Sequence, residues 1–107
     1  MDRLERIRTL NDRLRHTGQG GMILVSAGVA ALPICEAEVT ATVAAFDQFD
    51  EDNDPYGEHD FGALVLAGER LFWKIDYYDP SLIEGSPDPA DETHTERVLT
   101  IMLASEY

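Results

Sequence analysis

The strongest structural signal of this chain is the run FGALVLAGERLFWKIDYY at residues 61–78. Two apolar and aromatic stretches, 61–66 and 71–78, flank a short link around Gly68, which predicts a β-hairpin with its turn there. Side chains alternate between the two faces of a strand. Leu71, Trp73, Ile75 and Tyr77 should therefore face the core, while Phe72, Lys74, Asp76 and Tyr78 take the other side.

Upstream of the hairpin, the sequence predicts two helices and one short strand. Leu4, Ile7, Leu10 and Leu14 recur at helical spacing within residues 2–16, and three glycines among residues 18–21 end that helix. The apolar run 22–26 is expected to be a buried strand. Pro33 marks the start of a second helix, which should end near Phe49 and turn Val39, Val43 and Phe46 inward. Residues 50–59 then form a polar loop.

Downstream of the hairpin, the sequence predicts a third helix. It should begin between Asp88 and Thr93, which are both suitable N-cap residues, and run to about Ser105. Its apolar face would be wide, because it includes Val98, Leu99, Ile101, Met102 and Leu103. We expect this face to be deeply buried or shared with a second subunit, so a homodimer is possible and a dimeric regulatory or interaction protein is one alternative function.

These elements follow the order α-β-α-β-β-α over residues 1–107. We expect a single α+β domain, in which a three-stranded, largely antiparallel sheet has helices packed against one face. A chain of 107 residues has room for one core only. No export signal is readable, and no apolar run approaches the roughly 20 residues that cross a bilayer. The expected compartment is the cytoplasm, without membrane contact.

Charge is distributed very unevenly along the chain, whose formal net charge is −13. Residues 1–16 carry five arginines and three acids, whereas residues 17–107 carry three basic residues and eighteen acids. No lysine or arginine interrupts the nine acids between Glu36 and Asp60. Such a surface would repel phosphates, so direct binding of nucleic acid is not expected.

Two features of the polar loop suggest other chemistry. Asp50, Asp52 and Asp54 have the alternate spacing of calcium ligands, but Pro55 and Phe61 stand where a calcium loop requires Gly and Glu. The pair His59–Asp60 could serve acid/base chemistry. An alternative hypothesis is therefore a small metal-dependent or acid/base enzyme centred on His59 and its neighbouring carboxylates. We expect no cofactor, no metal and no catalytic residues, because no established catalytic or cofactor motif is present.

Three motifs carry a resemblance to a known family: NDPYGEHDFG at residues 53–62, FWKIDYYD at 72–79 and GSPDPAD at 85–91. The chain resembles a small bacterial family of unknown function that is often encoded on plasmids and integrative elements. The resemblance implies the genomic company of anti-restriction and anti-CRISPR inhibitors, but no site residues.

The leading hypothesis is a non-enzymatic acidic inhibitor. Its carboxylates would imitate a phosphate backbone and occupy the DNA-binding surface of a basic protein or ribonucleoprotein complex, such as a CRISPR surveillance complex or a restriction enzyme. The residues expected to bind this partner are Asp47, Asp50, Glu51, Asp52, Asp54 and Glu58, followed by Asp76 and Asp79.

Overall fold

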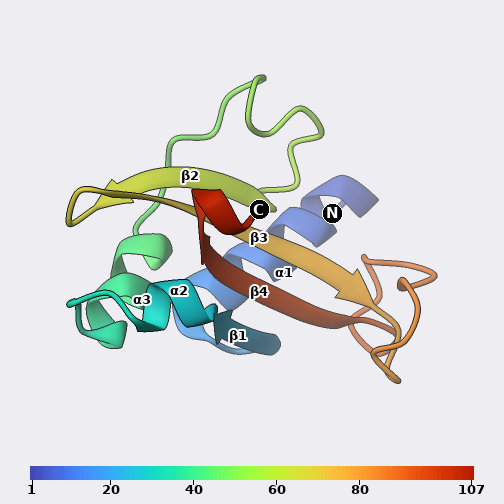
Figure 1. Ribbon diagram of the computed structural model, residues 1–107. Helices are drawn as coiled ribbons and strands as arrows, with labels where there is room; N and C mark the ends of the chain where they lie inside the picture. Colours follow the sequence, from blue (N-terminus) through green and yellow to red (C-terminus); the bar gives the residue numbers. More distant parts are fainter.

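The computed structural model describes residues 1–107 and contains one four-stranded sheet with helices on one of its faces (Figure 1). The elements are α1 (Arg3–Thr17), β1 (Gly21–Val25), α2 (Ala27–Ala30), α3 (Glu36–Ala44), β2 (Phe61–Leu66), β3 (Glu69–Tyr78), β4 (Glu96–Leu103) and the 3-10 helix η1 (Ala104–Glu106). The strand order is β1-β4-β3-β2, with β1 parallel to β4 and the other pairs antiparallel. The α+β class is confirmed, but the sheet is mixed and four-stranded instead of three-stranded.

The predicted hairpin is confirmed. β2 and β3 pair from Phe61 opposite Lys74 to Leu66 opposite Glu69. Ala67 and Gly68 form the turn with φ of 52° and 78°, as two-residue turns that match strand twist require. Leu71, Trp73 and Ile75 are buried in the core. The alternation read from the sequence therefore places the two faces of β3 correctly.

The predicted third helix is wrong, because residues 96–103 form the strand β4. β4 lies between β1 and β3, so it pairs on both sides and is apolar on both faces. A strand of this kind reads as a continuous apolar run without a period of two. A run this short cannot be told from a buried helix by periodicity. The paired neighbours decide in favour of the strand.

The first helix is confirmed, and the second is shorter than expected. In α1, Ile7, Leu10 and Leu14 are buried, and Asp2 caps the helix by accepting a hydrogen bond from the N–H of Glu5. α3 ends at Ala44 instead of near Phe49, and the Arg15 side chain donates to the carbonyls of Val43 and Ala44 in its last turn and of Phe46 just beyond it. Such carbonyls have no partner within the helix itself. The single turn α2, capped by Ser26, was not expected.

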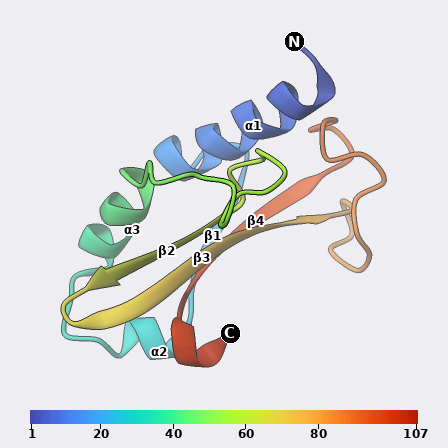
Figure 2. The ribbon, with the colours of Figure 1, turned by 90° about the horizontal axis from the view of Figure 1, so that it is seen from above.

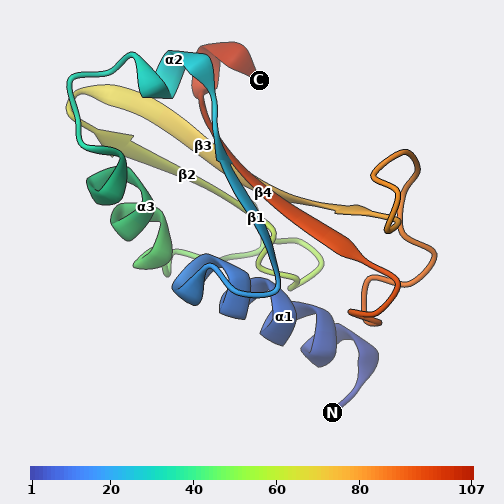
Figure 3. The same ribbon diagram turned by 90° about the horizontal axis from the view of Figure 1, so that it is seen from below.

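The core lies between the sheet and the helices α1 and α3. Figures 2 and 3 show these two helices on one face of the sheet, while η1 and the C-terminus lie at one end of it. Side chains from α1, α2, α3 and all four strands meet in this layer. Trp73 is fully buried at its centre, against Phe46 and Phe49. The expectation that helices cover one face of the sheet is confirmed, and the opposite face carries no long helix.

Packing around Trp73 generates a first prediction. A Cβ added at Gly62 would lie 2.3 Å from Trp73 Nε1, whereas one added at Gly85 would lie 3.8 Å from its nearest atom. Gly62→Ala should lower the free energy of unfolding by about 1–3 kcal/mol, because overpacking displaces the buried ring. Urea titration measures this loss. Gly85→Ala is the matched control, and equal stabilities of the two variants would contradict the proposed packing.

Candidate binding surface

The acidic segment 47–60 is seated on the polar side of α1. The Nε of Arg8 donates to the carbonyl of Gly57 at 2.7 Å, and the Nδ2 of Asn11 donates to the carbonyl of Glu58 at 3.0 Å. Arg8, Asn11 and Arg15 recur at spacings of three and four along α1, so they present one polar stripe beside its apolar one. The helix therefore fixes the path of the segment through its backbone.

His59 joins this segment to α1 through its side chain. Its Nδ1 lies 2.9 Å from Asp12 Oδ1, and its Nε2 lies 3.7 Å from Asp54 Oδ2. The ring stacks on Phe49 with centroids 3.8 Å apart. Both ring nitrogens thus face carboxylates, and one ring face is covered. This arrangement bridges two parts of the chain, and the acid/base alternative centred on His59 stays a prediction.

Arg15 is the most buried cation at this place, with 4% of its surface exposed. Its Nη1 donates to the carbonyls of Val43, Ala44 and Phe46, and its Nη2 donates to Asp12. The guanidinium also lies 5.3 Å from the ring centroids of both Phe49 and Trp73. One side chain therefore joins α1, the end of α3 and the aromatic core.

A second buried polar network is centred on Asn11, which lies one turn before Arg15 in α1. Asn11 is fully buried; it donates to the Tyr77 hydroxyl at 2.7 Å and accepts from Arg97 Nε at 2.8 Å. Tyr77 in turn donates to Glu58 Oε1 at 2.7 Å. Burial and the bond to Glu58 raise the pKa of Tyr77. Burial lowers the pKa of Arg97, which also donates to the carbonyl of Pro89. This network ties the segment to β3 and β4.

The structure divides the predicted partner-binding residues into two groups. Five of the eight are engaged within the molecule. Among these, Asp50 and Asp79 cap local turns, Asp54 is buried against His59, and Glu58 belongs to the network of Tyr77. Asp76 pairs with Lys74 at 2.8 Å. The exposed and least engaged residues are Glu51, Asp52 and Asp47, of which only Asp47 accepts a bond, from the adjacent Gln48. Sequence reasoning did not separate these groups.

The arginines of α1 do not form an opposing basic surface. Arg3 pairs with Asp88, and Arg6 and Arg13 both pair with Glu92, so they hold the connection between β3 and β4. The contact with Arg13 lowers the pKa of Glu92. Of the remaining basic side chains, Arg15, Lys74, Arg8 and Arg97 have the partners given above, and Arg70 lies over the Phe72 ring. The basic side chains are therefore largely engaged within the molecule.

The pKa of Asp60 reflects the burial and the negative charge at the end of the acidic segment. Burial raises the pKa of the Asp60 carboxyl above its ordinary value, and the nearby charge of Glu58 raises it further. Asp54 and Asp76 act in the same direction with smaller effects. Ionised Asp60 is thus partly buried close to other carboxylates and has no ion-pair partner of its own, which costs folding free energy at neutral pH.

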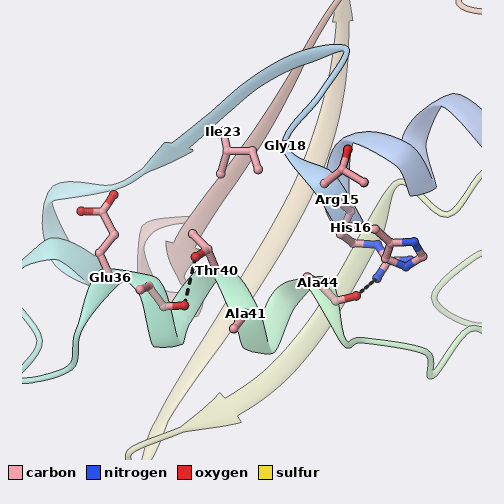
Figure 4. Close-up of a pocket in the computed structure, with 10 residues that line it drawn as sticks. Arg15, His16, Gly18, Ile23, Glu36, Thr40, Ala41 and Ala44 are labelled. Carbon is pink, nitrogen blue, oxygen red and sulfur yellow. Dashed lines mark hydrogen bonds between the residues drawn. The ribbon is translucent and has the colours of Figure 1, made fainter.

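A cavity of about 390 Å³ opens between the end of α1, β1 and α3 (Figure 4). Its α3 wall consists mainly of small residues, Ala37, Thr40, Ala41 and Ala44, which leave the space open. His16 and Glu36 supply its charged or titratable side chains at the rim, and Arg15 lies in its wall. The cavity contains none of the carboxylates of residues 47–60.

Two further kinds of feature were sought in the structure, metal-ligand clusters and membrane-spanning helices. No group of three or more His, Cys, Asp or Glu side chains is arranged to hold a metal ion. None of the helices is both long and apolar enough to cross a membrane. Asn11, Arg15 and Tyr77 were not predicted to build this surface, whereas His59 was named only as the centre of the acid/base alternative. Their one sequence signal is the helical spacing of Asn11 and Arg15 next to the apolar stripe of α1.

Comparison with known proteins identifies the family. The family model described as "Protein of unknown function (DUF3768)" matches residues 25–106. Because this match covers most of the chain, the protein belongs to that family, and the resemblance to a family of unknown function is confirmed. No curated protein and no solved structure matches the chain.

Replacement of Arg15 tests the contact that joins α1 to α3. Arg15→Lys keeps the charge but cannot reach three carbonyls and Asp12 at once, so it should lower the free energy of unfolding by about 2–4 kcal/mol. The matched control is Arg13→Lys, at an exposed ion pair, which should change stability little. Chemical denaturation compares the two variants. Equal effects would show that Arg15 acts only as a charge.

Replacement of Asp60 tests the crowding of carboxylates. A raised pKa means that the folded state binds this proton more tightly than the unfolded chain does, so ionised Asp60 destabilises the fold above its own pKa. Asp60→Asn should therefore raise the free energy of unfolding at pH 7. The gain should disappear as the pH falls below the ordinary Asp value of 3.8, where both states are protonated. Urea titrations across this pH range measure it, with exposed Asp47→Asn as control.

Proposed function

We propose that this member of the DUF3768 family is a non-enzymatic inhibitor, which binds a basic nucleic-acid-handling protein or ribonucleoprotein complex and blocks its DNA binding. The observation that carries the proposal is a set of exposed carboxylates without a cationic partner. We call this set the acidic surface, and it comprises Glu36, Glu38, Asp47, Glu51 and Asp52. A CRISPR surveillance complex and a restriction enzyme are the partner types that fit this chemistry.

The charge of the acidic surface supports this proposal because it is not neutralised within the molecule. Glu36 and Glu38 lie in the first turn of α3, and the segment after this helix carries the other three carboxylates. A surface that mixes both signs would attract partners of either charge only weakly. The five side chains of this set all carry negative charge, which would accelerate association with a basic groove and oppose association with nucleic acid.

Hydrogen bonds that fix the acidic segment 47–60 also support the proposed function. Asp50 Oδ1 accepts from the N–H groups of Asp52 and Asn53, and the Asn53 amide donates to the carbonyl of Gln48. Together with the contacts to α1, these bonds hold the backbone that carries Glu51 and Asp52. A binding surface that is ordered before association loses less entropy on binding. The carboxylates would therefore meet the partner in a preset arrangement, as phosphates do.

Charge reversal provides the test. Purified CRISPR surveillance complexes and restriction enzymes are incubated with labelled DNA, and fluorescence anisotropy measures the DNA that the protein displaces. The wild-type protein should displace DNA from at least one of these partners, and displacement should weaken as salt rises. Glu51→Lys with Asp52→Lys should weaken displacement by at least about tenfold, the equivalent of roughly 1.4 kcal/mol.

The matched control for this test is Glu69→Lys with Glu84→Lys. This pair lies at exposed positions outside the stretch 36–60 and changes the net charge by the same amount. It should displace DNA nearly as well as the wild type. If the two double variants behave alike, net charge alone acts and the acidic surface is not the binding site. If the wild type displaces DNA from none of the complexes, the proposal is wrong.

A further inference from the structure

We infer that the sheet face opposite α1 and α3, which we call the open face, binds the same face of a second copy of this chain. Register defines this face, because residues paired across neighbouring strands point to the same side. Phe72 is paired with Met102 and Ala63, and Lys74 is paired with Thr100 and Phe61. Figures 2 and 3 show that the long helices lie on the other side of the sheet.

The open face is more apolar than a solvated sheet face needs to be. Phe61, Phe72 and Tyr107 form an aromatic cluster on it, with ring centroids 5.3 to 6.1 Å apart. Val65 and Leu24 are 70% and 49% exposed. Antiparallel sheets with one solvated face normally alternate apolar and polar residues. β4 does not alternate in this way, because Val98 and Met102 lie on the open face and Leu99 and Ile101 face the core. Val98 and Met102 are each only 6% exposed within the single chain, so the exposed apolar area of this face comes mainly from Val65, Leu24 and Tyr107.

The charge of the open face favours a second copy as its partner. The strands β3 and β4 place two cations, Arg70 and Lys74, and two carboxylates, Asp76 and Glu96, on this side. The face is therefore balanced in a chain whose net charge is −13. Two acidic surfaces repel each other, but two open faces do not carry that excess. A strongly basic partner, by contrast, has little to attract it here.

The order of these charges along the strands fixes how two copies pack. Arg70 precedes Lys74 by four residues, and Glu96 is paired with Tyr78, four residues beyond Lys74. A two-fold axis that crosses the strands near Lys74 exchanges these two ends, and so brings Arg70 of each copy to Glu96 of the other. A two-fold axis along the strands would place Arg70 against Arg70. The first arrangement pairs opposite charges at both ends, as a closed dimer interface requires. The two Lys74 side chains meet at the axis, and each is paired there with Asp76 of its own chain at 2.8 Å.

Both charges are available for this contact. Arg70 is exposed and lies 5.5 Å from the centroid of the Phe72 ring, without a carboxylate within ion-pair distance. Glu96 is likewise without a cationic partner in its own chain. The same two-fold operation places the paired residues Phe72 and Met102 of one copy over the paired residues Asp76 and Val98 of the other. It also brings Tyr107, at one end of the sheet, toward the connection that exposes Ile83 at the other end.

The size of the open face indicates a dimer of moderate affinity. Four strands spaced by about 4.8 Å, with about six residues each at ~3.3 Å, cover roughly 400 Å² in projection. Stable complexes bury ~800 Å² per partner, and side-chain relief and the ends of the sheet add to the projected value. The interface therefore belongs to the small class. We expect a monomer–dimer equilibrium with a dissociation constant in the range of about 1–100 µM.

Sedimentation velocity of the full chain between about 1 and 500 µM tests the inference. The wild type should change from monomer to dimer over this range. Thr100→Arg places two added cations beside Lys74 near the axis and should shift the dissociation constant upward by at least about tenfold. Thr9→Arg, at an exposed position of α1, is the matched control and should dimerise like the wild type. Circular dichroism verifies that both variants are folded.

Charge exchange tests the register independently of any folding defect. Arg70→Glu alone and Glu96→Arg alone should each weaken the dimer, and the double variant should restore it. A wild type that stays monomeric throughout the range overturns the inference. So does a dimer that persists in Thr100→Arg, because the contact would then lie elsewhere. Failure of the double variant to restore dimerisation overturns the proposed packing.

Discussion

The buried guanidinium of Arg15 is the contact on which the arrangement of the helices depends. It donates to three carbonyls at the end of α3 and to Asp12 of its own helix, and it lies over the rings of Phe49 and Trp73. A charge this deeply buried is stable only when polar groups surround it. The end of α3, the start of the acidic segment and the packing of the aromatic core therefore form one mutually dependent unit.

The engagement of other basic side chains within the molecule leaves the surface acidic. The chain has eight basic side chains, and packing or ion pairs engage nearly all of them within the molecule. Carboxylates outnumber them, so the remainder must face solvent. Those in residues 47–58 are themselves divided, since Asp54 and Glu58 turn inward and Glu51 and Asp52 turn outward. The basic side chains thus stabilise the fold through internal contacts and leave the excess carboxylates at the surface.

Local patterns predicted the fold where the chain is buried on one face only. The hairpin of β2 and β3 and the helix α1 have clear periods, so their buried faces were read correctly. β4 was mistaken for a helix, because a central strand that is apolar on both faces loses its period, and Thr93 with Glu96 imitates a helix cap. In the structure Thr93 instead bonds to Asp91 within a turn. Neither β1 nor the mixed sheet can exist without β4, so one misread segment changed the topology.

Composition and periodicity alone established an α+β fold, a helix-covered core around Trp73 and a strong excess of negative charge. These properties are local or additive, so no knowledge of distant contacts is needed to read them. Tertiary structure alone decided which carboxylates are free, which arginines are engaged and which sheet face is open. Those properties depend on residues far apart in sequence, such as Arg15 with Ala44 or Asn11 with Arg97. Burial in a shared core brings these residues together, and no local pattern records it.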